Sequence, residues 1–174
     1  MTPGSGTAAT QRQAHVIVAS TSAATGAAPD RTGPVLFEWL HERGFTVTGP
    51  EIVADGLPVA RATQAAIERQ PAVVITTGGT GVAPSDKTPE AVAPLLDVEL
   101  PGLIEELRRR GAGTFPNALL TRGIAGFAGN TFVITLPGSP GGVRDGLAVL
   151  APVIDHVIAQ RTGEADAALH PPRT

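Results

Sequence analysis

The run Thr76-Thr77-Gly78-Gly79-Thr80-Gly81 has the residue types of a phosphate-binding loop. It directly follows the apolar residues 72–75, so we expect a buried strand to end where the glycines begin. Glycine has no Cβ to block a close approach, and successive backbone N–H groups can converge on phosphate oxygens. Threonine hydroxyls add further donors. The run therefore predicts an anion site formed by residues Thr77, Gly78, Gly79, Thr80 and Gly81.

Asp86, five residues further on, separates this segment from two commoner phosphate motifs. A P-loop that began at Gly81 would have glycine at position 86, before Lys87 and Thr88. A dinucleotide fingerprint that began at Gly79 would have glycine in place of Pro84. A carboxylate in a phosphate cradle repels an anion unless a divalent metal lies between them. We therefore reject both motifs and predict that Asp86 is a metal ligand.

Composition excludes several classes of protein. The chain has 174 residues, enough for one domain, with a hydrophobic content of 42% and a net charge of −3. Nucleic acid is an unexpected partner because there is no basic excess. No apolar run approaches the roughly 20 residues that span a bilayer, and residues 1–13 lack the apolar segment of a signal peptide. We expect a cytoplasmic protein without membrane contact.

The histidines and the missing cysteines restrict metal chemistry. With no cysteine, any metal must be held by oxygen or histidine. The histidines, at positions 15, 41, 156 and 170, have no ligand or triad spacing, so we interpret them as structural or surface residues.

Short apolar runs alternate with helical patterns, which is typical of α/β proteins with a mainly parallel sheet. The expected strands are 15–19, 45–53 and 72–77, with a hairpin formed by 124–127 and 131–136. The first expected helix begins at Thr32-Gly33-Pro34, with Val35, Leu36, Trp39 and Leu40 on one face. Further helices are expected over 58–70, 88–96, 101–110, 116–122 and 143–160. Gly111 is expected to end the helix over 101–110.

Ligands of open parallel sheets bind at the carboxyl ends of the strands. The loops 20–32, 54–56, 78–88 and 137–142 should therefore meet at one edge, where Asp55 and Asp86 could hold Mg²⁺ against phosphates. Loop 137–142 contains Gly138 and Ser139 before a helix, which is a second potential anion site. Two anion sites favour a ligand with at least two phosphates. Asp55-Gly56 is also an ordinary turn, and loop 137–142 could merely connect a strand to a helix.

Five motifs, in their order and spacing, resemble the molybdopterin adenylyltransferase family, which includes bacterial Mog and MoaB proteins and the G domains of gephyrin-like proteins. The motifs are TTGGTG, Asp86 with Thr88-Pro89-Glu90, Glu99-Leu100-Pro101-Gly102, Thr121-Arg122, and Leu136-Pro137-Gly138-Ser139-Pro140. The resemblance covers about residues 14–160. It implies a three-layer αβα sandwich, a homotrimer, and Mg²⁺-dependent adenylation of molybdopterin by ATP with release of pyrophosphate. We expect residues 1–13 and 162–174 to be disordered tails.

The resemblance also implies roles for single residues. Asp55 and Asp86 match the family's two functional aspartates, residues 78–81 match its phosphate loop, and Ser139 matches the serine of its second glycine loop. Further candidates are Ser20 and Asp30 in the first loop, and Glu105 and Arg108 after Pro101-Gly102. The first loop is rich in alanine and has no arginine before Asp30, a departure from the family pattern.

Two functions stay open at this point. The first is adenylation, which the retained aspartates favour, with hand-off to a separate molybdate-inserting protein. The second is a MoaB-like trimer that binds the pterin without efficient turnover. The sequence does not assign the pterin and ATP to particular loops.

Overall fold

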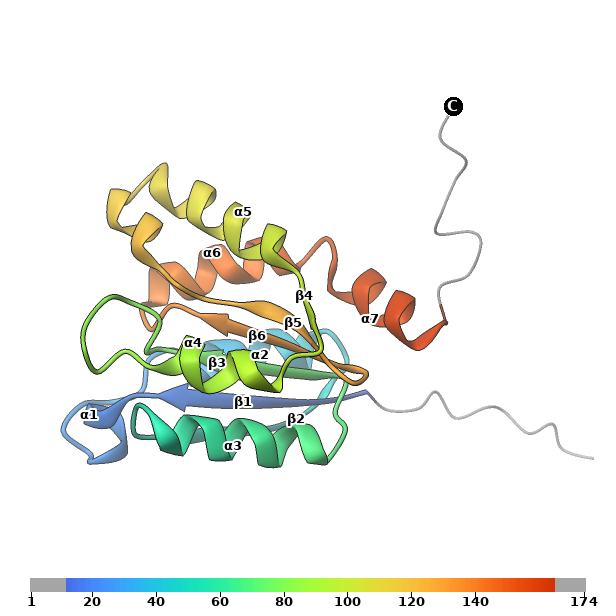
Figure 1. The fold of residues 1–174 in the computed structure, drawn as a ribbon, viewed down its shortest axis with the longest axis horizontal. Coiled ribbons are helices and arrows are strands. Elements are labelled where there is room, and N and C mark those ends of the chain that lie inside the picture. The colour runs from blue at the N-terminus through green and yellow to red at the C-terminus, as the bar shows by residue number, and fades with distance from the viewer. Residues whose placement is uncertain (1–11, 165–174) are drawn as a thin grey trace, which may run out of the picture.

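The computed structural model describes residues 12–164, which form a six-stranded sheet between two layers of helices (Figure 1). Four neighbouring strands, in the order β2-β1-β3-β6, run parallel, while β5 pairs antiparallel with β6 and β4 antiparallel with β5. The strands are β1 (Gln13–Ala19), β2 (Thr46–Val53), β3 (Val73–Thr77), β4 (Val98–Glu99), β5 (Ala125–Ala128) and β6 (Thr131–Leu136). The predicted α/β sandwich, its mainly parallel sheet and the β5–β6 hairpin are confirmed.

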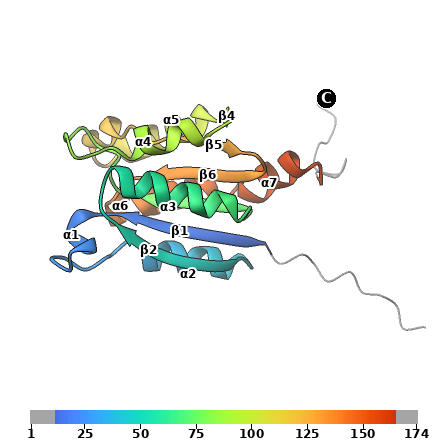
Figure 2. The same ribbon diagram turned by 60° about the horizontal axis from the view of Figure 1, so that its bottom comes forward.

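Helices cover both faces of the sheet (Figure 2). One face carries α2 (Gly33–Glu42), α5 (Pro101–Ala112), α6 (Pro140–Leu150) and α7 (Ile154–Thr162), and the other carries α3 (Leu57–Glu68) and α4 (Thr88–Val92). Short helical turns complete the described chain, namely α1 (Thr21–Ala24), η1 (Ala93–Leu95) and η2 (Pro116–Leu120). The sheet is thus the middle of three layers.

The central strand β3 begins with three consecutive apolar residues, and their side chains pack on both faces of the sheet. Val73 and Ile75 pack in the cluster that contains α2, α5, α6 and α7, whereas Val74 packs in the cluster that contains α3 and α4. All three side chains are fully buried. Because successive side chains of a strand point to opposite faces, a strand covered on both sides is apolar at every position. Each such side chain contributes about 1.5–3 kcal/mol to folding.

The helix after β6 differs from the prediction. The sequence predicted one helix over 143–160, but α6 ends at Leu150 and α7 begins at Ile154. Pro152 lies between them, and a proline inside a helix removes a backbone donor and clashes with the preceding turn. The chain therefore divides at this residue.

Two further helix predictions were wrong in detail. Val35 is 41% exposed, because the buried face of α2 consists of Gly33, Leu36 and Leu40, and the centre of this face lies roughly 130° around the helix from Val35. Gly111 does not end α5, which continues to Ala112. A Cβ on Gly111 would lie 2.7 Å from the Cβ of Ala118, so this glycine allows η2 to pack closely against α5.

Two short elements, α1 and β4, were not predicted, and the tails are described only in part. Gln13 lies in β1 and Thr162 in α7, whereas residues 1–11 and 165–174 lie outside the described residues, His170 with them. His15 is buried, with hydrogen-bond contacts to Thr48 and Glu51, which agrees with a structural role. Within residues 12–164, no helix combines the length and the apolar character needed to cross a membrane.

Candidate active site

A cavity of about 620 Å³ lies at the carboxyl ends of β1 and β3. Loops that follow β1, β2, β3 and β6 all contribute to its walls, as the parallel order of these strands requires. The predicted site residues that line it are Ser20, Asp30, Asp55, Thr77, Gly78, Gly79, Asp86 and Gly138. The structure therefore brings both aspartates and both glycine loops to one cavity.

Two glycines of the first glycine loop, Gly78 and Gly79, leave no room for a side chain. Gly78 has φ +93°, and a Cβ there would lie 2.2 Å from the carbonyl oxygen of Ala19 at the end of β1. Gly79 has φ +65°, and its Cβ would lie 2.9 Å from Oδ1 of Asp55. Only glycine fits a left-handed backbone at such distances. The N–H of Gly78 donates to the carbonyl of Leu136, so this group continues the sheet, and the open part of the loop begins at Gly79.

The second glycine loop lies directly against the first. A Cβ on Gly138 would lie 3.0 Å from Cα of Gly78, and the buried Oγ1 of Thr77 donates to the carbonyl of Pro137 at 2.8 Å. Ser139 follows as the N-cap of α6, where its Oγ accepts from the N–H of Gly142 at 3.1 Å. The positive end of the α6 dipole thus lies beside the first glycine loop.

Asp55 joins the loop after β2 to the loop after β1. Its Oδ2 accepts hydrogen bonds from the N–H of Thr21 at 3.2 Å and from Oγ1 of Thr21 at 2.9 Å. These bonds occupy one carboxylate oxygen, while the other, Oδ1, lies 2.9 Å from the Cβ position of Gly79. Asp55 is therefore fixed in place with one oxygen beside the first glycine loop.

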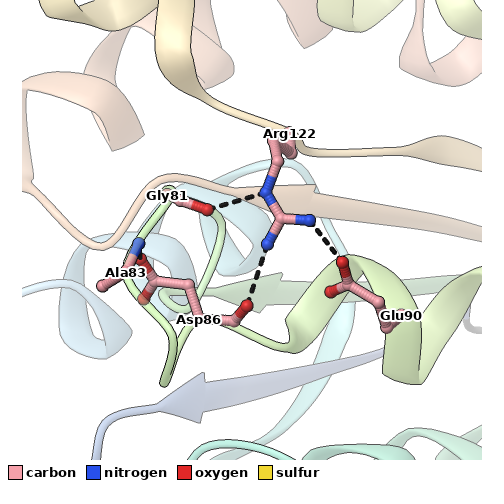
Figure 3. A network of polar contacts seen from close by, with 5 residues as sticks. All are labelled: Gly81, Ala83, Asp86, Glu90 and Arg122. Carbon is pink, nitrogen blue, oxygen red and sulfur yellow. Dashed lines mark hydrogen bonds and ion pairs between the residues drawn. The ribbon is translucent and has the colours of Figure 1, made fainter.

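Asp86 ends the exposed turn that follows the first glycine loop. Its Oδ2 accepts from the N–H of Ala83 at 3.0 Å, and a Cβ on Gly81 would lie 2.7 Å from the same oxygen. Figure 3 shows the turn, with Arg122 beside it and in contact with Gly81, Asp86 and Glu90. Glycine at position 81 thus leaves room for the carboxylate.

The donors at this site fit a magnesium–phosphate complex. Mg²⁺ prefers oxygen, and proteins often supply only one or two carboxylates while phosphates and water complete the octahedron. Asp55 and Asp86 match that supply. Within residues 12–164, no group of three or more acidic or histidine side chains could hold a metal. A metal here would depend on a phosphorylated ligand.

The charged residues that line the cavity are Asp30, Arg31, Asp55 and Asp86. Three carboxylates and one guanidinium disfavour a polyanion by itself, so a divalent cation would make binding favourable. Asp30 also has a local structural role, because its Oδ1 accepts from the N–H groups of Thr32 at 2.9 Å and Gly33 at 3.0 Å, at the start of α2. Ser20 also acts locally, since its Oγ caps α1 through the N–H of Ala23.

Several predicted residues lie outside the cavity lining. Thr80 is buried, with Oγ1 accepting from Oγ1 of Thr121 at 3.0 Å, and Nε of Arg108 donates to the carbonyl of Thr121 at 2.8 Å. Glu105 is exposed on α5. Thr80 and Arg108 therefore stabilise the segment beside the first glycine loop without lining the cavity. The predicted ligand contacts of Thr80, Gly81, Glu105, Arg108 and Ser139 stay predictions.

Three residues near the site were not predicted to be part of it. Thr21 holds Asp55, Arg31 is the arginine of the cavity lining, and Arg122 contacts the turn of Asp86. For Arg31 a signal existed, because it directly follows Asp30. For Arg122 the signal was its place in the motif Thr121-Arg122, which carries no separate indication of role.

The mainly parallel sheet covered on both faces, with two glycine loops and two aspartates at one cavity, defines a three-layer α/β protein whose candidate site lies at the carboxyl edge of the sheet. The family model described as "Probable molybdopterin binding domain" matches residues 15–156, and the chain belongs to this family. This result confirms the family resemblance found in the sequence.

Curated relatives carry several names. The chain is 40% identical over 147 residues to a molybdenum cofactor biosynthesis bifunctional protein of Synechococcus elongatus, which covers 84% of this chain and 46% of that protein. It is 38% identical to molybdenum cofactor biosynthesis protein B of Bacillus anthracis, over 74% of this chain and 79% of that one. It is 34% identical to the molybdopterin adenylyltransferase of Helicobacter pylori strain J99, over 82% and 84%. The chain spans about half the length of the bifunctional relatives.

Solved structures agree with the fold. The molybdopterin biosynthesis Mog protein from Mycobacterium ulcerans superimposes with a TM-score of 0.83 at 49% identity, covering 86% of this chain and 99% of that chain. The order of helices and strands is therefore shared along nearly the whole of that protein.

Proposed function

We propose that this chain binds molybdopterin and ATP in the cavity at the carboxyl edge and transfers the adenylyl group of ATP to the terminal phosphate of molybdopterin. The observation that carries the proposal is that Gly79, Asp55 and Asp86 line one cavity. The name of the Helicobacter relative, molybdopterin adenylyltransferase, supports the same reaction. Other relatives are named for molybdenum cofactor biosynthesis, the process in which this step would occur.

The reaction needs no nucleophile from the protein. A terminal phosphate oxygen of molybdopterin attacks the α-phosphorus of ATP and forms a new phosphoanhydride bond. The bond from the α-phosphorus to the oxygen that bridges to the β-phosphorus breaks, and pyrophosphate leaves with the electron pair. The protein would contribute orientation and neutralisation of charge, which dominate catalysis of phosphoryl and nucleotidyl transfer.

Different residues would orient the phosphates and neutralise their charge. The backbone of Gly79 would bind phosphate oxygens in the cavity, and Gly138 at the start of α6 would form the second anion site. Asp55 and Asp86 would hold Mg²⁺, which when bound neutralises phosphate charge and stabilises the leaving pyrophosphate. Arg31 adds a positive charge on the opposite loop.

A second candidate function is pterin binding without efficient adenylation. The relative from Bacillus anthracis is named only as molybdenum cofactor biosynthesis protein B, at 38% identity, and this name includes no adenylyl transfer, so the alternative stays open. In that case the same cavity would hold molybdopterin for another protein.

Release of pyrophosphate separates the two candidates. The purified chain is mixed with ATP and Mg²⁺, with and without molybdopterin, and pyrophosphate is followed over time. Release that requires both molybdopterin and Mg²⁺ supports adenylation. Calorimetric binding of molybdopterin without release supports the binding function, and neither binding nor release would overturn both.

The oligomeric state, the cellular compartment and the partner protein are also proposals. We infer a homotrimer in the cytoplasm that passes the adenylylated pterin to a separate molybdate-inserting protein. The family resemblance supports all three statements, and the cavity requires no nucleic acid or membrane partner.

A further inference from the structure

Arg122 contacts both ends of the turn that carries Asp86. Its Nε donates to the carbonyl of Gly81 at 2.8 Å, and its Nη2 donates to the carbonyl of Asp86 at 2.8 Å. Its backbone N–H donates to the carbonyl of Thr80 at 2.7 Å. Arg122, which lies 36 positions from Asp86 in the sequence, thus bridges the first and last residues of the turn (Figure 3).

The turn has little else to hold it. Residues 82–85 are all exposed, and Val82 is 66% exposed although it is a large apolar residue. Within the turn, the N–H of Asp86 donates to the carbonyl of Ala83 at 2.9 Å, and Oδ2 of Asp86 accepts from the N–H of Ala83. Segments with few buried contacts open readily unless hydrogen bonds from outside restrain them.

Other contacts fix Arg122 itself. Its Nη1 forms an ion pair with Glu90 on α4, and the side chain is 37% exposed. The preceding residue, Thr121, is buried and donates from Oγ1 to Oγ1 of Thr80 at 3.0 Å. The carbonyl of Thr121 accepts from Nε of Arg108 on α5. The guanidinium is therefore anchored to the scaffold on both sides of the turn.

We propose that Arg122 is the positioning residue of this site, which holds the turn 81–86 so that the carboxylate of Asp86 faces the cavity. The inference rests on the proposed function for its catalytic meaning, but the ordering of the turn can be measured without any substrate. A guanidinium is suited to this task because its planar fork presents several donors in fixed directions. Lysine has one ammonium and cannot reproduce the two carbonyl contacts and the ion pair.

The experiment compares four variants with the wild type. Arg122→Gln removes the charge and the fork, Arg122→Lys keeps the charge, and Glu90→Gln removes the ion pair while keeping both carbonyl contacts. Arg109→Gln is the matched control, because Arg109 is an exposed arginine paired with Glu106 on α5, away from the turn. Amide hydrogen exchange of residues 80–88 in the ligand-free protein is the first measurement.

We expect exchange in the turn to be about ten- to a hundredfold faster in Arg122→Gln and Arg122→Lys, because each lost hydrogen bond to a charged group weakens closure by that order. Glu90→Gln should change exchange less, and Arg109→Gln should leave it as in the wild type. Unchanged exchange in folded Arg122→Gln or Arg122→Lys would overturn the proposal, whether or not the protein turns over ATP.

Kinetics then test the link to catalysis. If the wild type releases pyrophosphate, Arg122→Lys should lower kcat at least tenfold while the KM for molybdopterin changes little, and a higher Mg²⁺ concentration should restore part of the rate. A merely structural arginine would not produce this Mg²⁺ dependence, so its absence would contradict the catalytic part.

Two outcomes stay distinct. A wild type without turnover but with faster exchange in the Arg122 variants would refute adenylation and leave the ordering of the turn intact. If both Arg122 variants fail to fold, the Nε–H of Arg122 in the wild type provides the test. Rapid exchange of that proton would mean that it is not bonded to the carbonyl of Gly81, and the proposal would fail.

Discussion

Asp86 is the residue on which the proposed chemistry depends most. Asp86→Asn keeps the size of the side chain and an acceptor for the N–H of Ala83, but it removes the negative charge. We expect pyrophosphate release to fall by about a hundredfold or more, because losing a metal ligand costs several kcal/mol of transition-state stabilisation. Calorimetric titration should show molybdopterin binding close to that of the wild type. Wild-type turnover in the variant would refute the metal assignment.

Gly79 tests whether the glycine loop requires an open backbone. In Gly79→Ala the new Cβ would lie 2.3 Å from Oγ1 of Thr88, at φ +65°. Gly26→Ala is the matched control, because Gly26 has φ +75° with nothing within 4 Å of its Cβ position. Both variants carry about 1–2 kcal/mol of backbone strain, but only Gly79→Ala adds a clash. A larger fall in melting temperature for Gly79→Ala, with weaker ATP binding, is expected. Equal behaviour would mean that the clash relaxes easily.

Ser139 has a structural role that bears on its predicted ligand contact. Because Oγ caps α6, Ser139→Ala should destabilise the protein by about 1 kcal/mol even without ligand. If Oγ also binds phosphate, molybdopterin or ATP should bind about ten- to a hundredfold more weakly as well. Thermal unfolding and titration with each ligand separate the two effects. A lower melting temperature with both dissociation constants unchanged would leave the cap as the sole role.

At the level of elements, the contact between α4 and the segment before β5 should respond to acid. The hydrogen bond from Arg122 lowers the pKa of Glu90 below its ordinary value of 4.5, with a smaller effect from the charge of Lys87. A carboxyl whose pKa is lower in the folded protein stabilises it above the unfolded value, and this contribution is lost as the pH falls through the folded value. The protection of the turn 80–88 against hydrogen exchange, taken relative to the intrinsic rate at each pH, should therefore fall below pH 4.5.

Two variants check this pH dependence. Glu90→Gln should abolish the acid step in exchange of the turn. Glu106→Gln should not, although Arg109 lowers the pKa of Glu106 in the same way, because that pair lies within α5. An acid step that persists in Glu90→Gln would assign it to another carboxyl.

Elements with long, regular patterns were predictable from the sequence. The convergence of Asp55 and Asp86 followed from parallel strands, whose carboxyl ends must share an edge. The part played by Arg122 could not be predicted, because it depends on side-chain direction across 36 residues rather than on a repeating pattern. Neither α1, with four residues, nor β4, with two, was predictable, since such segments carry too little periodicity. The break at Pro152 has a clear signal in the sequence, because a proline cannot continue the interior of a helix.

At the level of the whole molecule, we expect a trimer in solution. The family resemblance is the main support, and large apolar side chains of the α5–η2 region are available for burial, with Phe115 62%, Leu119 58% and Leu120 51% exposed. Light scattering at micromolar concentration should give three times the mass of one chain. A monomer under these conditions would contradict the prediction.

The positions of the two described chain ends have a practical consequence. Arg12, just before β1, and Glu164, just after α7, line the same second cavity, at the amino ends of β1 and β3. Because the strands are parallel, this edge is opposite the candidate active site (Figure 1). A fluorescent reporter or a surface anchor attached at Arg12 or Glu164 would therefore start from the edge opposite the candidate active site, and the protein could be immobilised with that site facing the solution.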